Sequence, residues 1–182
     1  LIKFLNYECV VSNEPKIIET STHLILPGVG AFGASMEKIK KMIPIEILEN
    51  QVLRKKKPFL GICVGMQVMT EIGEEFGRHQ GLGWIKGKVV KIKSKILPHI
   101  GWNNVVIKKS SKIFTGLSEH RDFYFVNSFH CNLNDKNLVI AETEYEETFC
   151  SAFQKENIIG VQFHPEKSQK TGQILIKNFL SL

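Results

Sequence analysis

The sequence predicts an α/β fold in which a mixed, mostly parallel sheet is flanked by helices. Apolar strand-like runs alternate with amphipathic helical stretches in the first half, and from Trp84 onward apolar residues recur with a period of two. This order is typical of a helix-covered sheet with its functional site at the carboxyl ends of the strands. With 182 residues, 43% of them hydrophobic, the chain is expected to form a single domain over 1–182.

The N-terminal third predicts helices and two short strands. The apolar periodicity of residues 1–7 indicates that the given sequence begins within a helix. A short strand is predicted at 8–11 and a short helix at 15–20. A strand is predicted at 23–26. The amphipathic region 32–57 is predicted to be helical with a break near Pro44, because proline cannot continue a helix.

The rest of the chain predicts mainly strands. The apolar run that ends at Cys63 is predicted to be a strand. A helix is predicted after it, through Ile72, and then a loop over 73–83. A closing amphipathic helix is predicted at 173–179. The period of two predicts strands at 84–92, 103–107, 123–129, 138–145, 149–154 and 158–163, with a hairpin turn at 155–157.

The segment Pro58–Gln67 carries the strongest chemical signal. Its apolar strand stops at Cys63, which has Gly61 and Gly65 on either side and a helical stretch after it. Strand, sharp turn and helix around one nucleophilic side chain form a nucleophile elbow, with sulfur in place of the serine hydroxyl. The glycines are required where strand and helix pack closely. A buried structural cysteine is the alternative, and for a lone cysteine it is the commoner case.

A second segment, Gly160–Glu166, supplies partners for such a nucleophile. A strand ends at His164, and Glu166 follows two residues later. Cysteine, histidine and an acid form the set that a thiol nucleophile needs, because imidazole moves the proton and the carboxylate orients the imidazole. Taken alone, this segment could equally be a turn that ends a strand.

The glycine-rich segment Pro27–Gly30 also follows a strand. It lacks the spacing of a dinucleotide site and the lysine of a P-loop, which argues against a phosphate cradle. An oxyanion hole and an ordinary tight turn remain as interpretations.

Charge and cysteine content exclude several classes of protein. The net charge of +6 comes from dispersed lysines without interleaved aromatic residues, so no nucleic acid partner is expected. The densest alternating lysines, over 86–95, predict a solvated sheet face or edge. The four cysteines lack metal or redox spacing, which is typical of reduced thiols in a cytoplasmic protein, and no run is long enough for a membrane span.

Together, the elbow, the His-Pro-Glu segment and Pro27–Gly30 resemble the class I (triad) glutamine amidotransferases over essentially the whole chain. This resemblance implies their flavodoxin-like fold. The segments 98–103, 123–128 and 164–168 are similar to one branch, the glutaminase subunits of imidazole glycerol phosphate synthase, an enzyme of histidine biosynthesis.

The resemblance implies roles for individual residues. Cys63, His164 and Glu166 would form the catalytic triad. The amides of Val29 and Val64 would form the oxyanion hole, and Gly30, Gln67 and Ser128 would hold the substrate. The residues expected at a partner interface are His99, Trp102, Asn103, Tyr124 and Lys167. For a lone His99 no second metal ligand is near, so no metal site is expected.

The implied activity is hydrolysis of L-glutamine to glutamate and ammonia through a cysteine thioester, without metal or organic cofactor. Ammonia would pass to a synthase subunit of (β/α)₈-barrel type in a heterodimer. One alternative is a paralogue that feeds ammonia to a surface-sugar amidination enzyme. A stand-alone cysteine peptidase or γ-glutamyl hydrolase and a catalytically silent binding subunit are further alternatives.

Two departures from the family pattern stand out. The family opens with a strand that this sequence lacks, and we expect about 15 to 20 residues to be missing before Leu1. In addition, Asn127 and Phe129 replace a histidine and a tyrosine that the family most often carries. The replacements at Asn127 and Phe129 would affect any role of these two positions in partner signalling, and they leave the triad unchanged.

Overall fold

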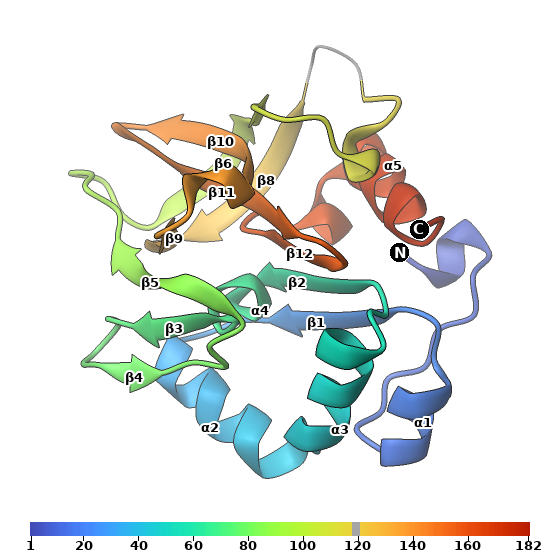
Figure 1. Ribbon diagram of the computed structural model, residues 1–182. Coiled ribbons are helices and arrows are strands. Elements are labelled where there is room, and N and C mark those ends of the chain that lie inside the picture. Colours follow the sequence, from blue (N-terminus) through green and yellow to red (C-terminus); the bar gives the residue numbers. More distant parts are fainter. Residues whose placement is uncertain (118–120) are drawn as a thin grey trace.

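The computed structural model describes residues 1–117 and 121–182. Its strands form a ten-stranded mixed sheet and a separate two-stranded sheet (Figure 1). In chain order the strands are β1 (Leu24–Gly28), β2 (Phe59–Cys63), β3 (Thr70–Gly73), β4 (His79–Gln80), β5 (Ile85–Lys91), β6 (His99–Asn104), β7 (Val106–Ile107), β8 (Asp122–Asn127), β9 (Phe129–Leu133), β10 (Val139–Tyr145), β11 (Glu147–Lys155) and β12 (Ile158–Val161).

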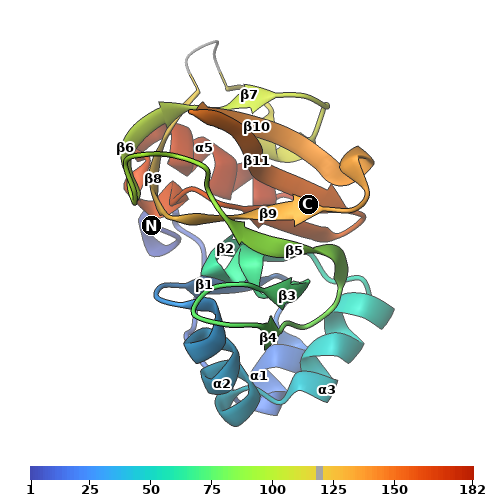
Figure 2. The same cartoon turned by 90° about the vertical axis from the view of Figure 1, so that its left-hand side faces the viewer.

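The main path through the large sheet runs β1-β2-β12-β11-β9-β5-β3-β4, and β10 joins it through β11 and carries β7. The α-helices are α1 (Pro15–Thr20), α2 (Phe32–Met42), α3 (Ile45–Glu49), α4 (Val64–Gln67) and α5 (Gln169–Phe179). Figures 1 and 2 place α1, α2 and α3 on one side of β1 and β2 and α5 on the other. In the described part of the chain, no helix combines the length and apolar character that crossing a membrane requires.

The parallel centre of the sheet is the part that positions the site. Strand β2 lies between β1 and β12 and runs parallel to both. All five of its residues are buried, as expected for an apolar strand covered on both faces. Gly28 on β1 is the register partner of Cys63, and Val161 on β12 pairs with Ile62. The carboxyl ends of these strands therefore meet at one edge.

The two-stranded sheet β6–β8 packs against that edge through aromatic side chains. Phe123 of β8 stacks on Phe163 with ring centroids 3.9 Å apart, and Phe125 meets Phe163 edge-on at 5.7 Å. His99 of β6 stacks between Phe125 and Tyr145, at 4.9 and 4.0 Å. The inner face of this sheet is thus apolar and closely packed, and it reaches the chain immediately before His164.

The predicted mixed sheet with flanking helices is confirmed. The break at Pro44 separates α2 from α3, and a two-residue turn joins β11 to β12 through the pairing of Lys155 with Ile158. The predicted lysine face is also confirmed. The side chains of Lys86, Lys88 and Lys91 are exposed, although β5 lies inside the sheet, between β9 and β3, rather than at its edge.

Several element predictions were wrong. The predicted strand 103–107 is divided between the end of β6 and β7, and β4 forms within the predicted loop 73–83. Residues 8–11 form no strand; no strand of the described chain pairs with them, and Val10 and Val11 are 62% and 99% exposed. Over residues 1–7 only the 3-10 turn Lys3–Leu5 forms. The elbow helix ends at Gln67 instead of Ile72, because β3 pairs with β5 and β4, and a non-local ladder outweighs local helix propensity. Strand β9 was also missed, as a separate strand after Asn127.

Candidate active site

Cys63 occupies a strained turn between β2 and α4. Its backbone has φ 54° and ψ −113°, a conformation that residues other than glycine rarely adopt. A Cβ atom at Gly65 would lie 1.8 Å from the carbonyl oxygen of Leu26, and one at Gly61 would lie 2.5 Å from that of Gly65. The two glycines therefore permit the close packing of strand and helix that aims Cys63 out of the sheet edge. Cys63 is only 4% exposed.

His164 and Glu166 form a directly bonded pair beside the sulfur. The Nδ1 atom of His164 lies 2.7 Å from Oε1 of Glu166. A hydrogen bond with Cys63, and then the one with Glu166, raise the pKa of His164 to about 9, against the opposing effect of burial. Burial is the largest single effect on Glu166 and raises the pKa of its carboxyl. The hydrogen bond from His164, a backbone hydrogen bond and the charges of His164 and Lys167 together outweigh burial and lower that pKa. The three predicted triad residues thus come together from β2 and the turn after β12.

The backbone of His164 is held by strand β8. Its amide donates to the carbonyl of Tyr124 at 2.8 Å. The hydroxyl of Ser168 donates to the carbonyl of His164 at 2.6 Å and accepts from the amide of Tyr124 at 3.0 Å. Ser168 is fully buried, so no water competes for these bonds. The position of the imidazole is therefore tied to the two-stranded sheet.

Two groups that the sequence did not single out contact the sulfur. The side-chain amide nitrogen of Gln162 lies 3.7 Å from Sγ of Cys63, and the carbonyl oxygen of Val126 lies 3.9 Å from it. Gln162 also accepts a hydrogen bond from Nε2 of Gln67 at 3.0 Å. Gln67 donates in addition to the carbonyl of Phe129 at 3.0 Å. The amide of Gln67, a predicted substrate ligand, is therefore already bound within the protein through its nitrogen.

The predicted oxyanion loop lies beside the nucleophile. Because Gly28 is the register partner of Cys63, Val29 and Gly30 follow directly at the sheet edge. Val29 is 81% exposed, and Gly30 has φ 98°, which favours glycine. The carboxylate of Glu75 accepts from the amide of Phe32 at 2.8 Å, so it anchors the chain just after this loop. Val64, the second predicted donor, opens α4 and is 5% exposed.

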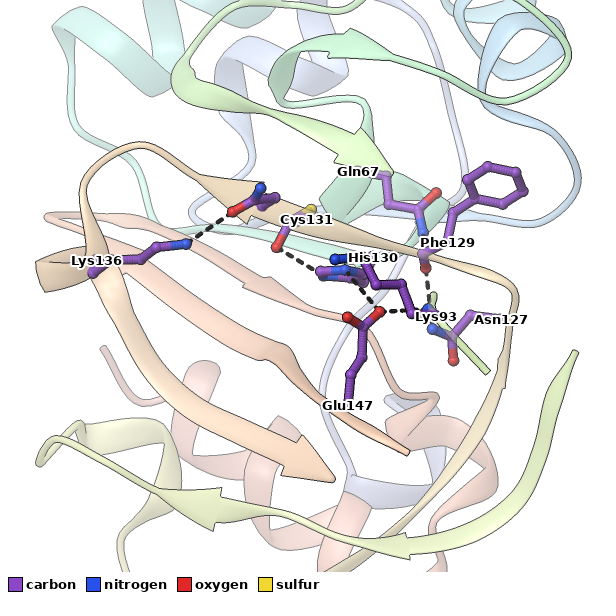
Figure 3. Close-up of polar contacts among 9 residues, drawn as sticks. Gln67, Lys93, Asn127, Phe129, His130, Cys131, Lys136 and Glu147 are labelled. Carbon is purple, nitrogen blue, oxygen red and sulfur yellow. Dashed lines mark hydrogen bonds and ion pairs between the residues drawn. The ribbon is translucent and has the colours of Figure 1, made fainter. Parts of the chain in front are cut away.

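Ser128 lies between β8 and β9, half-buried, and its carbonyl accepts from the amide of Ile92 at 2.9 Å. Next to it, Asn127 donates from Nδ2 to the carbonyl of Phe129 at 3.1 Å, while its buried Oδ1 has no hydrogen-bond partner among the residues that the structure describes. Asn127, one of the two departures from the family pattern, is thus connected to Gln67 through one carbonyl group (Figure 3).

The five residues predicted at a partner interface divide into two groups, and the first consists of buried His99 and half-buried Asn103. His99 is 2% exposed, burial lowers its pKa, and its Nε2 lies 3.2 Å from Nδ2 of Asn103. Asn103 in turn donates to the carbonyl of Glu144 at 2.9 Å. Both side chains are therefore directed into the protein rather than toward a partner.

Trp102, Tyr124 and Lys167 form a contiguous surface group, which we call the β6–β8 face. The ring of Trp102, 48% exposed, meets that of Tyr124 edge-on at 6.0 Å. The ammonium group of Lys167 lies over the Tyr124 ring, 5.7 Å from its centroid. Ile100, on the same side of β6 as Trp102, is 60% exposed. This face is accessible. One of its two strands, β8, also binds the backbone amide of His164.

Within residues 1–117 and 121–182, no cluster of three or more His, Cys, Asp or Glu side chains could hold a metal ion. The other three cysteines differ in their exposure. Cys9 is exposed, whereas burial raises the pKa of Cys131 well above its usual value and that of Cys150 to about 12. All four cysteines are free thiols.

Four functional contacts were not foreseen: those of Gln162, Ser168, Val126 and Glu75. Gln162 and Ser168 lie within the segment around His164, so their proximity to the triad was a signal that could have identified them. Val126 contacts the sulfur through its backbone carbonyl, which any residue type would supply. Glu75 bonds the amide of Phe32, which lies 43 positions away in sequence. Neither has a local sequence signature.

Comparisons with known proteins identify the family of the chain. The family model for "Glutamine amidotransferase class-I" matches residues 3–182. The chain is 44% identical over 183 residues to an imidazole glycerol phosphate synthase subunit HisH 2 from Methanococcus maripaludis, with 99% of this chain and 90% of the relative covered. It is 47% identical over 173 residues to a HisH subunit from Pyrococcus furiosus, covering 94% and 88%.

Solved structures support the fold independently. A glutamine amidotransferase crystal structure superposes with a TM-score of 0.75 at 16% identity, covering 99% of this chain and 88% of that one. Another glutamine amidotransferase, from Thermotoga maritima, gives 0.66 at 19% identity, covering 99% and 74%. The two sequence relatives are both named for imidazole glycerol phosphate synthase, which does not favour the sugar-amidinating alternative.

Proposed function

The chain belongs to the class I glutamine amidotransferase family, and we propose that it is the glutaminase subunit of an imidazole glycerol phosphate synthase, acting in cytoplasmic histidine biosynthesis. The observation that carries this proposal is that Cys63, His164 and Glu166 meet at one sheet edge, where His164 bonds Glu166 and its pKa responds most strongly to Cys63. The names of the sequence relatives supply the pathway.

The first half of the reaction forms a thioester. The proton of Cys63 passes to His164, and the sulfur attacks the side-chain carbonyl carbon of L-glutamine. The resulting imidazolium of His164, held by the Glu166 carboxylate, then gives this proton to the departing nitrogen. Ammonia leaves as the carbon–nitrogen bond breaks, and the γ-glutamyl group remains on sulfur.

The second half releases glutamate. His164, now neutral, takes a proton from water, whose oxygen attacks the thioester carbon. The carbon–sulfur bond breaks, the proton returns to the sulfur, and glutamate leaves. Glu166 holds the imidazole by its Nδ1–H throughout, which leaves the other ring nitrogen free to exchange the proton.

The oxyanion of each tetrahedral intermediate would be bound by the amides of Val29 and Val64. Gly30, Gln67 and Ser128 would hold the amino-acid end of the substrate. The two N–H groups of Gln67 are committed to Phe129 and Gln162, so only its side-chain oxygen remains to contact the ligand. Gln67 would therefore accept a hydrogen bond from the substrate's ammonium group.

Ammonia is mostly protonated at neutral pH, so this chemistry is useful only beside an acceptor site. The proposed acceptor is a (β/α)₈-barrel synthase subunit in a heterodimer, with the β6–β8 face as the docking surface. Trp102 and Tyr124 are the aromatic type of residue that concentrates binding energy at interfaces. His99 and Asn103 would support the docking surface indirectly, by holding β6 against β10.

The test measures glutamate released from L-glutamine by the full chain, alone and with the barrel subunit and its nucleotide substrate. We expect slow hydrolysis alone, a large rise with both additions, and loss of activity in Cys63→Ala. Cys9→Ala is the matched control, because Cys9 is an exposed thiol outside the site. Full activity in Cys63→Ala would refute the triad. Hydrolysis that never responds to the barrel subunit would refute the pathway assignment.

A further inference from the structure

Two buried glutamines lie next to the nucleophile. Gln162 is fully buried and Gln67 is 3% exposed. Their amides form a continuous chain: Nε2 of Gln67 contacts the carbonyl of Phe129 and Oε1 of Gln162, and Nε2 of Gln162 contacts Sγ of Cys63. Buried amides are costly unless their hydrogen bonds are satisfied, so their orientations are determined by their partners.

The partner that determines these orientations is the carbonyl of Phe129. A carbonyl oxygen only accepts, so Gln67 must present its NH₂ group to Phe129, and that same nitrogen faces Gln162. Gln162 must therefore offer its oxygen to Gln67, which leaves its own NH₂ group directed at Cys63. Figure 3 shows the first part of this chain, with Gln67 on one side of the Phe129 carbonyl and Asn127 on the other.

We propose that Gln162 is a further catalytic residue, which donates an N–H to the Cys63 sulfur and stabilises its negative charge before attack and when the thioester breaks. Asn127 and Gln67 are positioning residues in this arrangement, acting through the Phe129 carbonyl. The inference rests on the proposed glutaminase function, because it assigns the donor that the nucleophile of that reaction uses.

The surroundings of the sulfur explain why such a donor is needed. The carbonyl oxygen of Val126, 3.9 Å from Sγ, can accept from the thiol but repels an anionic sulfur. Cys63 is nearly inaccessible to water, so solvent cannot offset that repulsion. A pre-oriented N–H in a water-excluded site is worth more than the same group in water. Gln162 faces the sulfur from the β12 side and supplies it.

The decisive variant is Gln162→Glu. It keeps an oxygen for Gln67 but replaces the N–H that faces sulfur with a second oxygen. We expect kcat for glutamine hydrolysis to fall by about tenfold to a hundredfold, with KM changed by less than about twofold. Alkylation of Cys63 by iodoacetamide at neutral pH is expected to slow by about tenfold, because thiolate is the reactive form.

Gln162→Met is the second variant, because it has a similar volume, no charge and no N–H. It keeps the measurement informative if a buried glutamate prevents folding. Gln154→Glu is the matched control; this glutamine lies near the other end of the β11–β12 pair and bonds Ser111. Both readouts should be unchanged in it. All rates are compared at a temperature at which each variant remains folded.

The outcomes separate the two proposals. Wild-type kcat and alkylation rate in either folded Gln162 variant would overturn the role of Gln162, while hydrolysis by the wild type would still support the glutaminase. If the wild type failed to hydrolyse glutamine, the proposed function would fall. Unequal alkylation of wild type and variant would then still detect the donor.

Discussion

The elbow around Cys63 and the two-stranded sheet β6–β8 adjoin one another but are held together in opposite ways. Every residue of Phe59–Gln67 is buried, and the glycines at its centre leave less than 3 Å for an added Cβ atom. In β6 and β8 burial alternates along the strand, and the outer face carries exposed Ile100 and Trp102. Backbone packing holds the first region, and side-chain contacts hold the second.

Because of this difference, the two regions should respond differently to amino-acid substitution. A change in the elbow alters stability and chemistry together, because no neighbouring backbone can move aside. A change on the outer face of β6–β8 alters only what binds there, because its side chains support nothing beneath them. Tyr124 is intermediate, since its backbone holds that of His164 while its ring lies on the outer face.

The largest expected effect is that of Gly65→Ala. The added methyl group would overlap the carbonyl of Leu26, so we expect the free energy of unfolding, measured in urea, to fall by more than about 3 kcal/mol. Gly116→Ala is the control, because Gly116 has φ 73° but open space around it. That variant should lose only about 1 to 2 kcal/mol. Equal losses would mean that the elbow is not specially constrained.

The second expected effect is a pH dependence carried by His164. Its pKa rises from 6.5 to about 9 on folding, through Cys63 first and then Glu166. The folded state therefore binds the proton more tightly, and this stabilisation is complete below pH 6.5 and is lost as the pH rises to 9. The free energy of unfolding of the wild type should fall by up to about 3 kcal/mol across that window.

The matched variant for this titration is His164→Gln, measured by urea unfolding at the same series of pH values. Its stability should be nearly flat across the window, so the difference from wild type isolates His164 from the other titrating groups. A parallel decline in both proteins would contradict the assignment.

A third, smaller effect is expected on the β6–β8 face. Trp102→Ala should weaken binding of the proposed barrel subunit by about 30-fold, or about 2 kcal/mol, in a titration by calorimetry. The free energy of unfolding should change by less than about 0.5 kcal/mol, because the ring is half exposed. Phe4→Ala, at an aromatic side chain 72% exposed and outside the β6–β8 face, should leave binding unchanged.

The smallest expected effect is that of Lys167→Ala. Its ammonium group lies 5.7 Å from the Tyr124 ring at an exposed position, where such a contact contributes about 0.5 to 1 kcal/mol. We expect glutaminase activity without the partner to stay unchanged and partner binding to weaken less than in Trp102→Ala. Lys170→Ala, an exposed lysine in α5, is the control. A loss of basal activity would mean that this side chain acts on the triad.

Sequence and structure agree best where the information is local. The elbow was predicted because glycine, cysteine and glycine within five positions impose a steric requirement that few backbones satisfy. The break at Pro44 and the hairpin turn before Ile158 were also predicted from local sequence. Predictions failed at β3, β9 and residues 8–11, where a strand exists only if another segment pairs with it.

From the sequence by itself, Cys63 was predicted as the nucleophile and His164 and Glu166 as its partners, together with the strand-and-turn geometry that presents them. Each of these predictions depends on residues a few positions apart. Only the tertiary structure decided which side chains face the sulfur. The amide of Gln162 points at Cys63 because a carbonyl on β9 orients Gln67, and that carbonyl is placed by strands distant in sequence. Hydrogen-bond direction follows from the partners that the fold brings together, and those partners are not neighbours in the chain.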